Sequence, residues 1–585
     1  MKAVDPGIVG VSYQAPMTLQ DAENAINWYI EVAEVDGAKE PIALLGAPGK
    51  NPIITTQTGP VRGLWVLPGG LLALAVTGNT LYLITATVPA TQTSIAQFAV
   101  TAVGTLLTNS GPVVMRDNGV VSNAKGGYVF IVDGSFWYYY AIVGVTNAVT
   151  FIASTNGTAT LTLPGVLPAG LIIAPTATLA SSSGDIASGT YISSINYNTP
   201  SITMNANATG TNASETITLT VAPFGQITDP GVVPADRLLF IEGWILANQT
   251  GTRTFICSGP TPYTQTFPGS FFALKDSSTD NLITLYEMNR EAWMIGERTS
   301  EVWYNNEGQN NNFPFSRVPG VGPQIGCSAK HSITRMNTSL VWLAKNEQGE
   351  NVVIKTSQYD WVRISNHAIE TAIASYPLVS DAIGFSYEEG GHSFYVLIFP
   401  TADQTWVYDD TATAHLQKPC WHQRLSFDPM AGQYHRDRSN CFMNMQDLRL
   451  VGDYQSGQIH QMSRAYYTDA GYPLRAQRRC KHIWKDNDRT RVSQSSLQIE
   501  FTPGVGLQSG QGSSPQAMLR WSNDGGFTWS NEYWRSIGAA GATRNRAKWN
   551  RLGRARDRIY EVNMSDPVPR DIIGATLFAE SEDAL

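Results

Sequence analysis

The sequence predicts an all-β protein whose central part is a β-propeller of six or seven blades. Helical signals are scarce, and an apolar strand is repeatedly followed by a polar turn and a second strand that carries an aromatic residue. The last five of these hairpins start near Leu239, Ala292, Leu340, Phe394 and Leu448, at intervals of 53, 48, 54 and 54 residues. A period of about 50 residues in an all-β chain fits one four-stranded blade per repeat.

The first part of the chain divides at residue 55. We expect residues 1–55 to form an N-terminal arm with one short helix over residues 18–29, capped by Thr18 or Asp21. Residues 56–144 contain two more hairpins of the repeating type and are assigned to the first propeller blades.

Residues 145–225 interrupt the repeat. Between Gly134 and Gly225 only Asp185 and Glu215 are charged, and short Thr, Ile and Val strands alternate with Asn-Gly and Ser-Gly turns. We therefore expect a small β-domain inserted into a propeller loop, since the cost of closing a loop grows slowly with its length. A flexible low-complexity linker is the alternative. The blade pattern resumes over residues 226–470.

Residues 471–585 are predicted to form a C-terminal β-sandwich-like region, or an extension of the last blade. This region contains a complete Asp-box, Ser-x-Asp-x-Gly-x-Thr-Trp, in which Ser522, Asp524, Gly526 and Trp529 are the defining residues. The motif is typical of a tight hairpin: the carboxylate accepts backbone N–H groups, glycine allows positive φ and tryptophan packs beneath the loop. Its expected role is structural.

A run of basic residues follows the Asp-box. Because even-numbered positions dominate, most of these side chains share one face if the run is a regular strand. Such a face suits an acidic partner surface or a neighbouring subunit; a plain solvated surface and contact with DNA phosphates are the alternatives. The candidate assembly contacts are Arg544, Arg546, Lys548, Arg551, Arg554, Arg556 and Arg558.

No motif in the sequence supports catalysis or cofactor binding. A phosphate loop and a nucleophile elbow are absent, and Cys420 and His422 lack the paired ligand spacings of a zinc site. The five cysteines are odd in number and far apart, which predicts reduced thiols in a protein made in a cytoplasm. We expect no enzyme activity, no cofactor, no metal and no membrane span, since the uncharged stretches are interrupted by polar and turn residues.

Several segments together carry a family resemblance. They are Phe130-Ile-Val-Asp133-Gly134, Glu297-Arg-Thr-Ser-Glu301-Val-Trp-Tyr304, Thr405-Trp-Val-Tyr-Asp409, Leu450-Val-Gly-Asp453, and Trp549-Asn-Arg-Leu-Gly553. Their order along residues 60–144 and 226–575 resembles the packaged-DNA stabilisation proteins of tailed phages, the tail-hub or nozzle components of short-tailed virions. Residues 145–225 fall outside this resemblance.

The resemblance implies a structural protein of the bacteriophage virion tail, made in the cytoplasm of the bacterial host. Proteins of this kind form a homohexameric ring below the portal and its adaptor, or head-completion protein. They stabilise packaged DNA, conduct it during ejection and carry a tail fibre, spike or needle. A net charge of −8 agrees with a channel along which phage DNA slides, because phosphate-binding cations would retain it.

Two other functions remain open at the level of sequence. The Asp-box also occurs in sialidases, so a propeller that binds or cleaves host-surface glycans is the first alternative, although the Phe/Tyr-Arg-Ile-Pro signature of a sialidase site is absent. A trimeric receptor-binding fibre component is the second.

Overall fold

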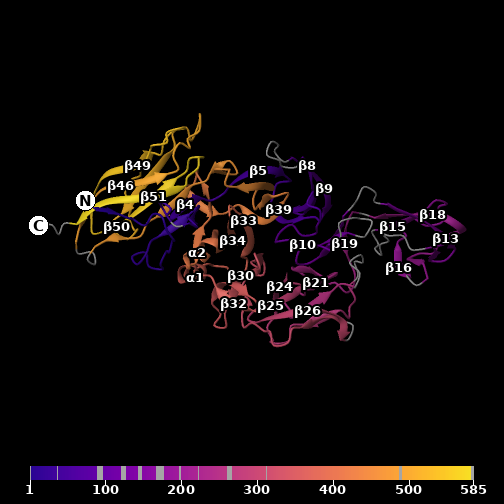
Figure 1. The fold of residues 1–585 in the computed structure, drawn as a ribbon. Coiled ribbons are helices and arrows are strands. Elements are labelled where there is room, and N and C mark those ends of the chain that lie inside the picture. The colour runs from indigo at the N-terminus through magenta and orange to yellow at the C-terminus, as the bar shows by residue number, and fades with distance from the viewer. Residues whose placement is uncertain are drawn as a thin grey trace.

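A computed structural model of the chain places three β-rich parts side by side (Figure 1). A propeller lies in the middle, a β-sandwich on one side of it, and a small inserted sheet on the other. The sandwich contains both the first and the last described strands. The structure describes residues 2–35, 37–88, 97–119, 127–142, 148–165, 177–196, 199–221, 223–259, 267–310, 313–485 and 490–581.

The propeller has seven blades, which confirms the predicted fold class. In each blade the first strand belongs to the innermost layer, and it packs near the corresponding strand of the neighbouring blades. Blade 1 is β6 (Val61–Val66), β7 (Leu72–Thr77), β8 (Thr80–Val88) and β9 (Gln97–Thr105); blade 2 is β10 (Val114–Asp117), β11 (Tyr128–Val132), β12 (Trp137–Ala141) and β19 (Phe224–Ile227); blade 3 is β20 (Leu238–Ile241), β21 (Trp244–Asn248), β22 (Thr254–Cys257) and β23 (Phe272–Leu274).

The next three blades follow the same meander. In blade 5 two short strands share the innermost position. Blade 4 is β24 (Leu282–Met288), β25 (Glu291–Gly296), β26 (Ser300–Asn310) and β27 (Phe313–Arg317); blade 5 is β28 (Gly326–Cys327) with β29 (Thr334–Met336), then β30 (Ser339–Lys345), β31 (Asn351–Ser357) and β32 (Asp360–Arg363); blade 6 is β33 (Ile383–Glu389), β34 (His392–Phe399), β35 (Gln404–Asp409) and β36 (Cys420–Gln423). A hairpin of β37 (Leu425–Asp428) and β38 (Gln433–Arg436) leads to blade 7.

Blade 7 is completed by a strand from the start of the chain. Its first three strands are β39 (Ser439–Met445), β40 (Leu448–Asp453) and β41 (Gln458–Ser463). The fourth is β5 (Gly49–Thr55), which pairs antiparallel with β41. The short strands β42 (Thr468–Asp469) and β43 (Tyr472–Pro473) extend this sheet beyond β5. The propeller ring is therefore closed by a sheet between residues about 400 positions apart in the sequence.

A buried ion-pair network holds β5 in blade 7. The Nζ of Lys50 lies 2.6 Å from Asp437 Oδ2 and 3.1 Å from Asp469 Oδ1, and its side chain is 2% exposed. Burial alone would lower the pKa of Lys50, but the two carboxylates outweigh it and raise the pKa. Lys50 and Arg424 in turn overcome the effect of burial on Asp437 and lower its pKa to about 2.

The insert leaves blade 2 between β12 and β19. Its six-stranded sheet is formed by β13 (Ala148–Asn156), β14 (Thr160–Thr162), β15 (Ala177–Ser181), β16 (Ile192–Asn196), β17 (Ser201–Met204) and β18 (Thr211–Val221). Of the predicted range 145–225, residues 145–147, 166–176, 197–198 and 222 lie outside the described residues. The predicted end needs correction, because Phe224 and Gly225 already belong to β19 and pair with Tyr140 and Tyr139 of the blade.

The sandwich consists of two sheets around a core that includes Trp28 and Trp549. One sheet has the order β3 (Trp28–Val32), β4 (Ile42–Gly46), β51 (Ile572–Ser581), β46 (Val492–Phe501), β49 (Ala547–Ala555), with β1 (Lys2–Val4) beside β51. The other has the order β2 (Asn24–Ile26), β44 (Ala476–Arg479), β50 (Asp557–Met564), β47 (Gln516–Ser522), β48 (Tyr533–Ser536), with β45 (Ile483–Trp484) beside β50. Because β2 also pairs with β36, this second sheet is continuous with blade 6.

The predicted N-terminal arm with a helix over residues 18–29 is wrong. Residues 24–26 and 28–32 are β2 and β3, separated by Asn27 with φ of 57°. Every residue from Asn24 to Ile30 is buried, because this segment runs between the sandwich and blade 6. Backbone pairing on both sides and burial of the whole segment override its modest helical propensity.

The two helices of the described chain lie in the propeller instead. α1 (His367–Ala374) is capped by Asn366, whose side chain accepts a hydrogen bond from the Ile369 N–H, and α2 (Asp410–Leu416) is capped by Asp409. Within the described residues, neither helix has the length and apolar character needed to cross a membrane.

Replacing Lys50 with alanine is expected to destabilise the propeller by roughly 3–5 kcal/mol, because Asp437 and Asp469 would stay buried with less compensating charge. The free energy of unfolding, followed by urea denaturation with tryptophan fluorescence, measures the effect. The matched control is Lys39→Ala, which removes a surface pair with Glu500 and is expected to cost at most about 1 kcal/mol. Equal stability of Lys50→Ala and Lys39→Ala would show that this network does not hold β5 in place.

Candidate functional site

The Asp-box forms the turn between β47 and β48. The Ser522 hydroxyl accepts a hydrogen bond from the Gly526 N–H at 2.8 Å, and Asp524 accepts one from the Thr528 N–H at 2.9 Å. Gly525 and Gly526 adopt φ of 73° and 98°, which side chains with a Cβ rarely reach. Hydrogen bonds from Ser522 and Thr528 lower the pKa of Asp524 to about 2, so this carboxylate is ionised at neutral pH.

Behind this turn two arginines converge on one buried carboxylate. Arg479 Nε lies 2.7 Å and Arg520 Nε 2.6 Å from the two oxygens of Glu561, whose side chain is fully buried. Both guanidinium groups also stack on the ring of Trp529, at 5.0 and 4.8 Å from its centroid. The acceptor atoms of the Asp-box and of Glu561 are thus occupied by the protein itself, which indicates a fold-stabilising role.

The basic run extends from the loop before β49, through β49, to the start of β50. Six of its seven members are exposed: Arg544, Arg546, Lys548, Arg551, Arg554 and Arg556. Arg558 is the exception, and its assignment as an assembly contact is wrong. It is 2% exposed, donates to the Leu552 carbonyl at 2.6 Å and to the Asn523 side chain at 2.8 Å, and so braces the Asp-box from inside.

The expected ladder on one face of a regular strand is also wrong. Lys548 alternates with the buried Ala547 and Trp549, but Arg551 has φ of 60° and the register of β46 against β49 shifts at this point. Beyond the shift, Leu552 and Ala555 are the buried residues. A bulge therefore redirects the second half of the run, as bulges in edge strands commonly do.

The exposed charges adjoin an open sheet edge that the sequence analysis did not identify. β48 pairs only with β47, and all four of its residues are exposed. It lies beside β49: Trp549 Nε1 donates to the Tyr533 carbonyl at 2.7 Å and Arg535 Nε to the Lys548 carbonyl at 3.0 Å. The resulting surface, here named the edge patch, consists of Tyr533, Trp534, Arg535, Arg544, Arg546 and Lys548.

The composition of the edge patch is that of a protein-binding surface. Trp, Tyr and Arg are the residues most enriched where binding energy concentrates. Arg546 is partly engaged within the chain, with Nε 3.5 Å from Glu500, and the Lys548 ammonium lies over the Phe578 ring. The sequence feature that could have pointed to the edge patch is the consecutive Tyr533-Trp534-Arg535. Strand alternation alone does not show that these residues lie on the edge of a sheet.

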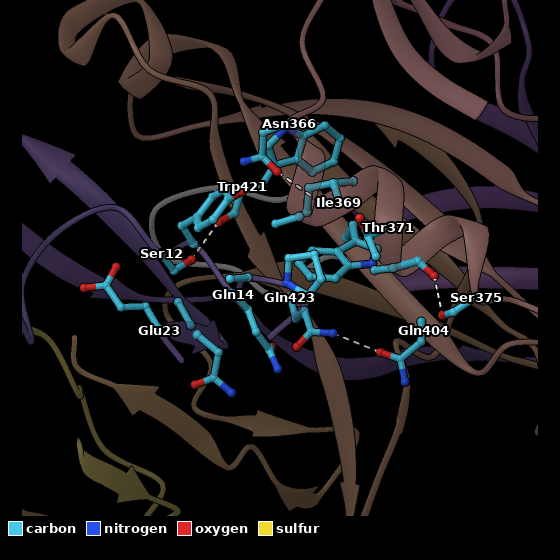
Figure 2. A pocket seen from close by; sticks show the side chains of 18 of the residues that line it. Ser12, Gln14, Glu23, Asn366, Ile369, Thr371, Ser375, Gln404, Trp421 and Gln423 are labelled. Carbon is cyan, nitrogen blue, oxygen red and sulfur yellow. Dashed lines mark hydrogen bonds between the residues drawn. The ribbon is translucent and has the colours of Figure 1, made fainter. Parts of the chain in front are cut away.

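A pocket of about 420 Å³ lies where the N-terminal segment meets the propeller. In Figure 2, Ser12 and Gln14 lie between α1 and the outer strands of blade 6 on one side and Glu23 on the other. The Ser12 hydroxyl donates to the Trp421 carbonyl at 3.0 Å, and the Gln423 amide donates to Gln404 at 2.9 Å. The contact of Ser12 with Trp421 joins segments about 400 residues apart in the sequence, whereas that of Gln423 with Gln404 lies within blade 6.

The lining of this pocket holds one carboxylate. Burial raises the pKa of Glu23 to about 7, although Arg478, with Nη2 3.9 Å away, counteracts it. Arg478 itself is committed to backbone carbonyls, among them Ile8 at 2.7 Å and Asn24 at 3.1 Å. The lining therefore offers no pair of carboxylates for general acid–base work. Among the described residues, no group of three or more His, Cys, Asp or Glu side chains is placed to hold a metal ion.

Two family models match the chain. The model described as bacteriophage P22 Gp10, beta-propeller, matches residues 166–467, just over half of the chain, and the one described as bacteriophage P22 Gp10, beta-sandwich, matches residues 477–580. The first match begins inside the inserted sheet, whereas the motif resemblance left residues 145–225 outside the family. The comparison with curated proteins gave no match.

Solved structures are similar to the chain only at low identity. PorZ, a surface component of the type-IX secretion system of Porphyromonas gingivalis, is 8% identical over 83% of this chain and 46% of its own, with a TM-score of 0.32. The Dos1 propeller is 8% identical over 71% and 95%, with a TM-score of 0.31. An exo-β-1,3-galactanase from Phanerochaete chrysosporium is 9% identical over 90% and 100%, with a TM-score of 0.23. The family models, and not these structures, assign the fold.

Glu23→Gln is expected to stabilise the protein in alkaline solution. A folded-state pKa of about 7 against an ordinary value of 4.5 means that Glu23 favours folding most at low pH and that this contribution is lost as pH rises from about 4.5 to 7. At pH 8 the variant should exceed the wild type by on the order of 2 kcal/mol, and at pH 4.5 the two should nearly coincide. Thermal unfolding midpoints at both pH values measure this difference.

The exposed Glu347→Gln serves as the control and should change neither midpoint. A Glu23→Gln variant that is less stable than the wild type at pH 8 would mean that Glu23 is ionised and held by Arg478.

Proposed function

Because the chain belongs to the family of bacteriophage P22 Gp10, tail-hub and DNA-stabilisation proteins of short-tailed phages, we propose that it forms a ring at the base of the virion tail. The observation that carries this proposal is the match of both family models, propeller then sandwich, in the order in which the fold has them. Six copies surround the channel below the portal and contact its adaptor, or head-completion protein. The ring retains packaged DNA and conducts it during ejection.

The edge patch supports this proposal as a contact between neighbouring components. Exposed aromatic side chains can pack against another chain, and the surrounding cations select an acidic partner. A partner surface on β48 would cover the exposed side chain of Trp534. The partner is a neighbouring subunit or the adaptor, and a fibre, spike or needle would attach elsewhere on the ring.

The charge distribution separates protein contacts from DNA contacts. The chain has 48 acidic and 40 basic residues, and the basic run lies on the sandwich. A channel that conducts DNA needs a surface without strong phosphate-binding sites, since each neutralised phosphate adds to retention. We therefore assign the edge patch to protein contact and place the DNA channel on another part of the surface.

The alternative function, a propeller that binds or cleaves host-surface glycans, has one observation in its favour. The pocket in Figure 2 offers amide groups of Gln404 and Gln423 beside aromatic rings, as sugar sites often do. Hydrolysis would need a second carboxylate beside Glu23, which the lining does not provide. The indole N–H groups of Trp406 and Trp421 are bound to Tyr376 and to the Ile364 carbonyl. Glycan binding by the isolated chain would favour this alternative.

Reversing two charges of the edge patch tests the tail-hub proposal. Arg535→Glu with Lys548→Glu should reduce incorporation into particles at least tenfold, because like charges would face the acidic partner. The unfolding midpoint should stay within about 2 °C of the wild type, since both side chains are exposed. Complementation of a phage that lacks the gene, with the chain quantified in purified virions, measures incorporation.

Lys418→Glu provides the matched control, an exposed charge reversal on the propeller. It should incorporate normally. Normal particles from the edge-patch double variant would show that its cations only protect the strand edge from aggregation.

A further inference from the structure

A partly open cavity of about 230 Å³ lies among the innermost strands, on the propeller axis. Its lining comes from blades 1, 2, 4, 5, 6 and 7 and from the segment that enters blade 3. No aspartate or glutamate is among the described residues that line it, whereas three arginines are. Arg62 is fully engaged, with backbone carbonyls including those of Gly111 and Gly78 as acceptors. The other two, Arg116 and Arg237, are not.

Arg116 and Arg237 have few partners for their charge. Arg116 stacks over the Trp65 ring at 4.6 Å and makes one hydrogen bond, from Nη1 to the Met115 carbonyl. Arg237 is 7% exposed, and its Nε donates to the Thr284 hydroxyl at 3.0 Å. Within the described chain, neither guanidinium has a carboxylate oxygen within 4.0 Å. Buried arginines are normally paired with an anion.

His331 extends the set of donors. Its Nδ1 lies 3.4 Å from Nη1 of Arg237, and a guanidinium can only donate, so Nδ1 accepts and the ring proton sits on Nε2. Burial, with the charges of Arg237 and Lys330, lowers the pKa of His331 well below its usual value, in agreement with a neutral ring. Two carboxylates nearby are already engaged: Asp236 with Lys330, and Asp117 with the Trp65 indole N–H.

The two guanidinium groups also act on each other. Burial and the charge of Arg116 lower the pKa of Arg237 to about 10. The charges of Asp117 and Glu287 act on Arg116, and that of Asp236 acts on Arg237, but burial outweighs them and lowers the pKa of both arginines. The two like charges therefore raise the free energy of the folded state. A bound anion would reverse this effect and add charge-assisted hydrogen bonds.

We propose that the axial cavity binds a small oxyanion of the phosphate and sulfate class between Arg116 and Arg237. The His331 Nε2–H supplies a further donor. These residues belong to blade 2, to the segment before β20 of blade 3, and to the segment before β29 of blade 5. The anion would therefore tie together blades that share no sheet hydrogen bonds, and ligand binding would stabilise the closed propeller. The cavity is too small for a DNA duplex.

Isothermal titration of the full chain with inorganic phosphate tests this site, with chloride at matched ionic strength as the reference. Phosphate should bind and raise the unfolding midpoint above the chloride value. Arg116→Gln and Arg237→Gln should each weaken phosphate binding at least tenfold, because a charge-assisted hydrogen bond is lost. Arg290→Gln is the matched control on an exposed arginine and should bind as the wild type does.

A second measurement keeps the test decisive if Arg237→Gln fails to fold. In buffer without phosphate or sulfate, Arg116→Gln should be at least as stable as the wild type, because it removes the like-charge repulsion. A sulfate titration and one with a short single-stranded DNA without terminal phosphate distinguish a free oxyanion from a nucleic-acid phosphate. Phosphate that gives no midpoint shift beyond chloride, or the same shift in Arg116→Gln, would overturn the proposal.

Discussion

The architecture depends on the pairing of β5 with β41. Seven blades form a closed ring only if the last sheet receives its fourth strand from the beginning of the chain. Lys50 makes this pairing specific, because its buried ammonium lies between Asp437 and Asp469 and a register shift would leave those carboxylates unpaired. The closure also pairs two strands whose edges would otherwise be open to other chains.

The same N-terminal segment fixes the sandwich to the propeller. β2 pairs with β36 on one side and β44 on the other, so one sheet runs through both domains. Side chains reinforce this junction: buried Arg478 donates to backbone carbonyls of the segment, and His392 lies 2.7 Å from Asp409 in blade 6 and 2.9 Å from Glu31 in β3. The raised pKa of His392 follows from these two carboxylates, which outweigh its burial. The edge patch on the sandwich is thereby held in a fixed orientation relative to the axial cavity.

The parts of the fold that local patterning controls could be predicted from the sequence. The 50-residue period predicts one blade per repeat, and the Asp-box predicts a hairpin at Ser522. Long-range pairing leaves no local signal, which is why the sequence predicts a helix over residues 18–29 and not the pairing of β2, β3 and β5. Arg558 shows the same limit at the level of a site: its spacing matches the exposed basic residues, but it belongs to β50, in the other sheet of the sandwich, where its side chain is buried. The sequence around α1 contains two helix-start signals, Asn366 as the cap and Glu370 in the first turn. The alternating strand patterns on both sides of this short segment are stronger, so the sequence does not predict the helix.

The central claim is that this chain forms the ring through which DNA leaves the virion. Cryo-electron microscopy of the phage particle with this chain fitted into the tail density tests it most directly. The account predicts six copies around the axis below the portal and its adaptor, with the edge patch of each copy buried against a neighbouring component. Density for this chain in a peripheral three-fold fibre, or an edge patch that faces solvent in all copies, would contradict it.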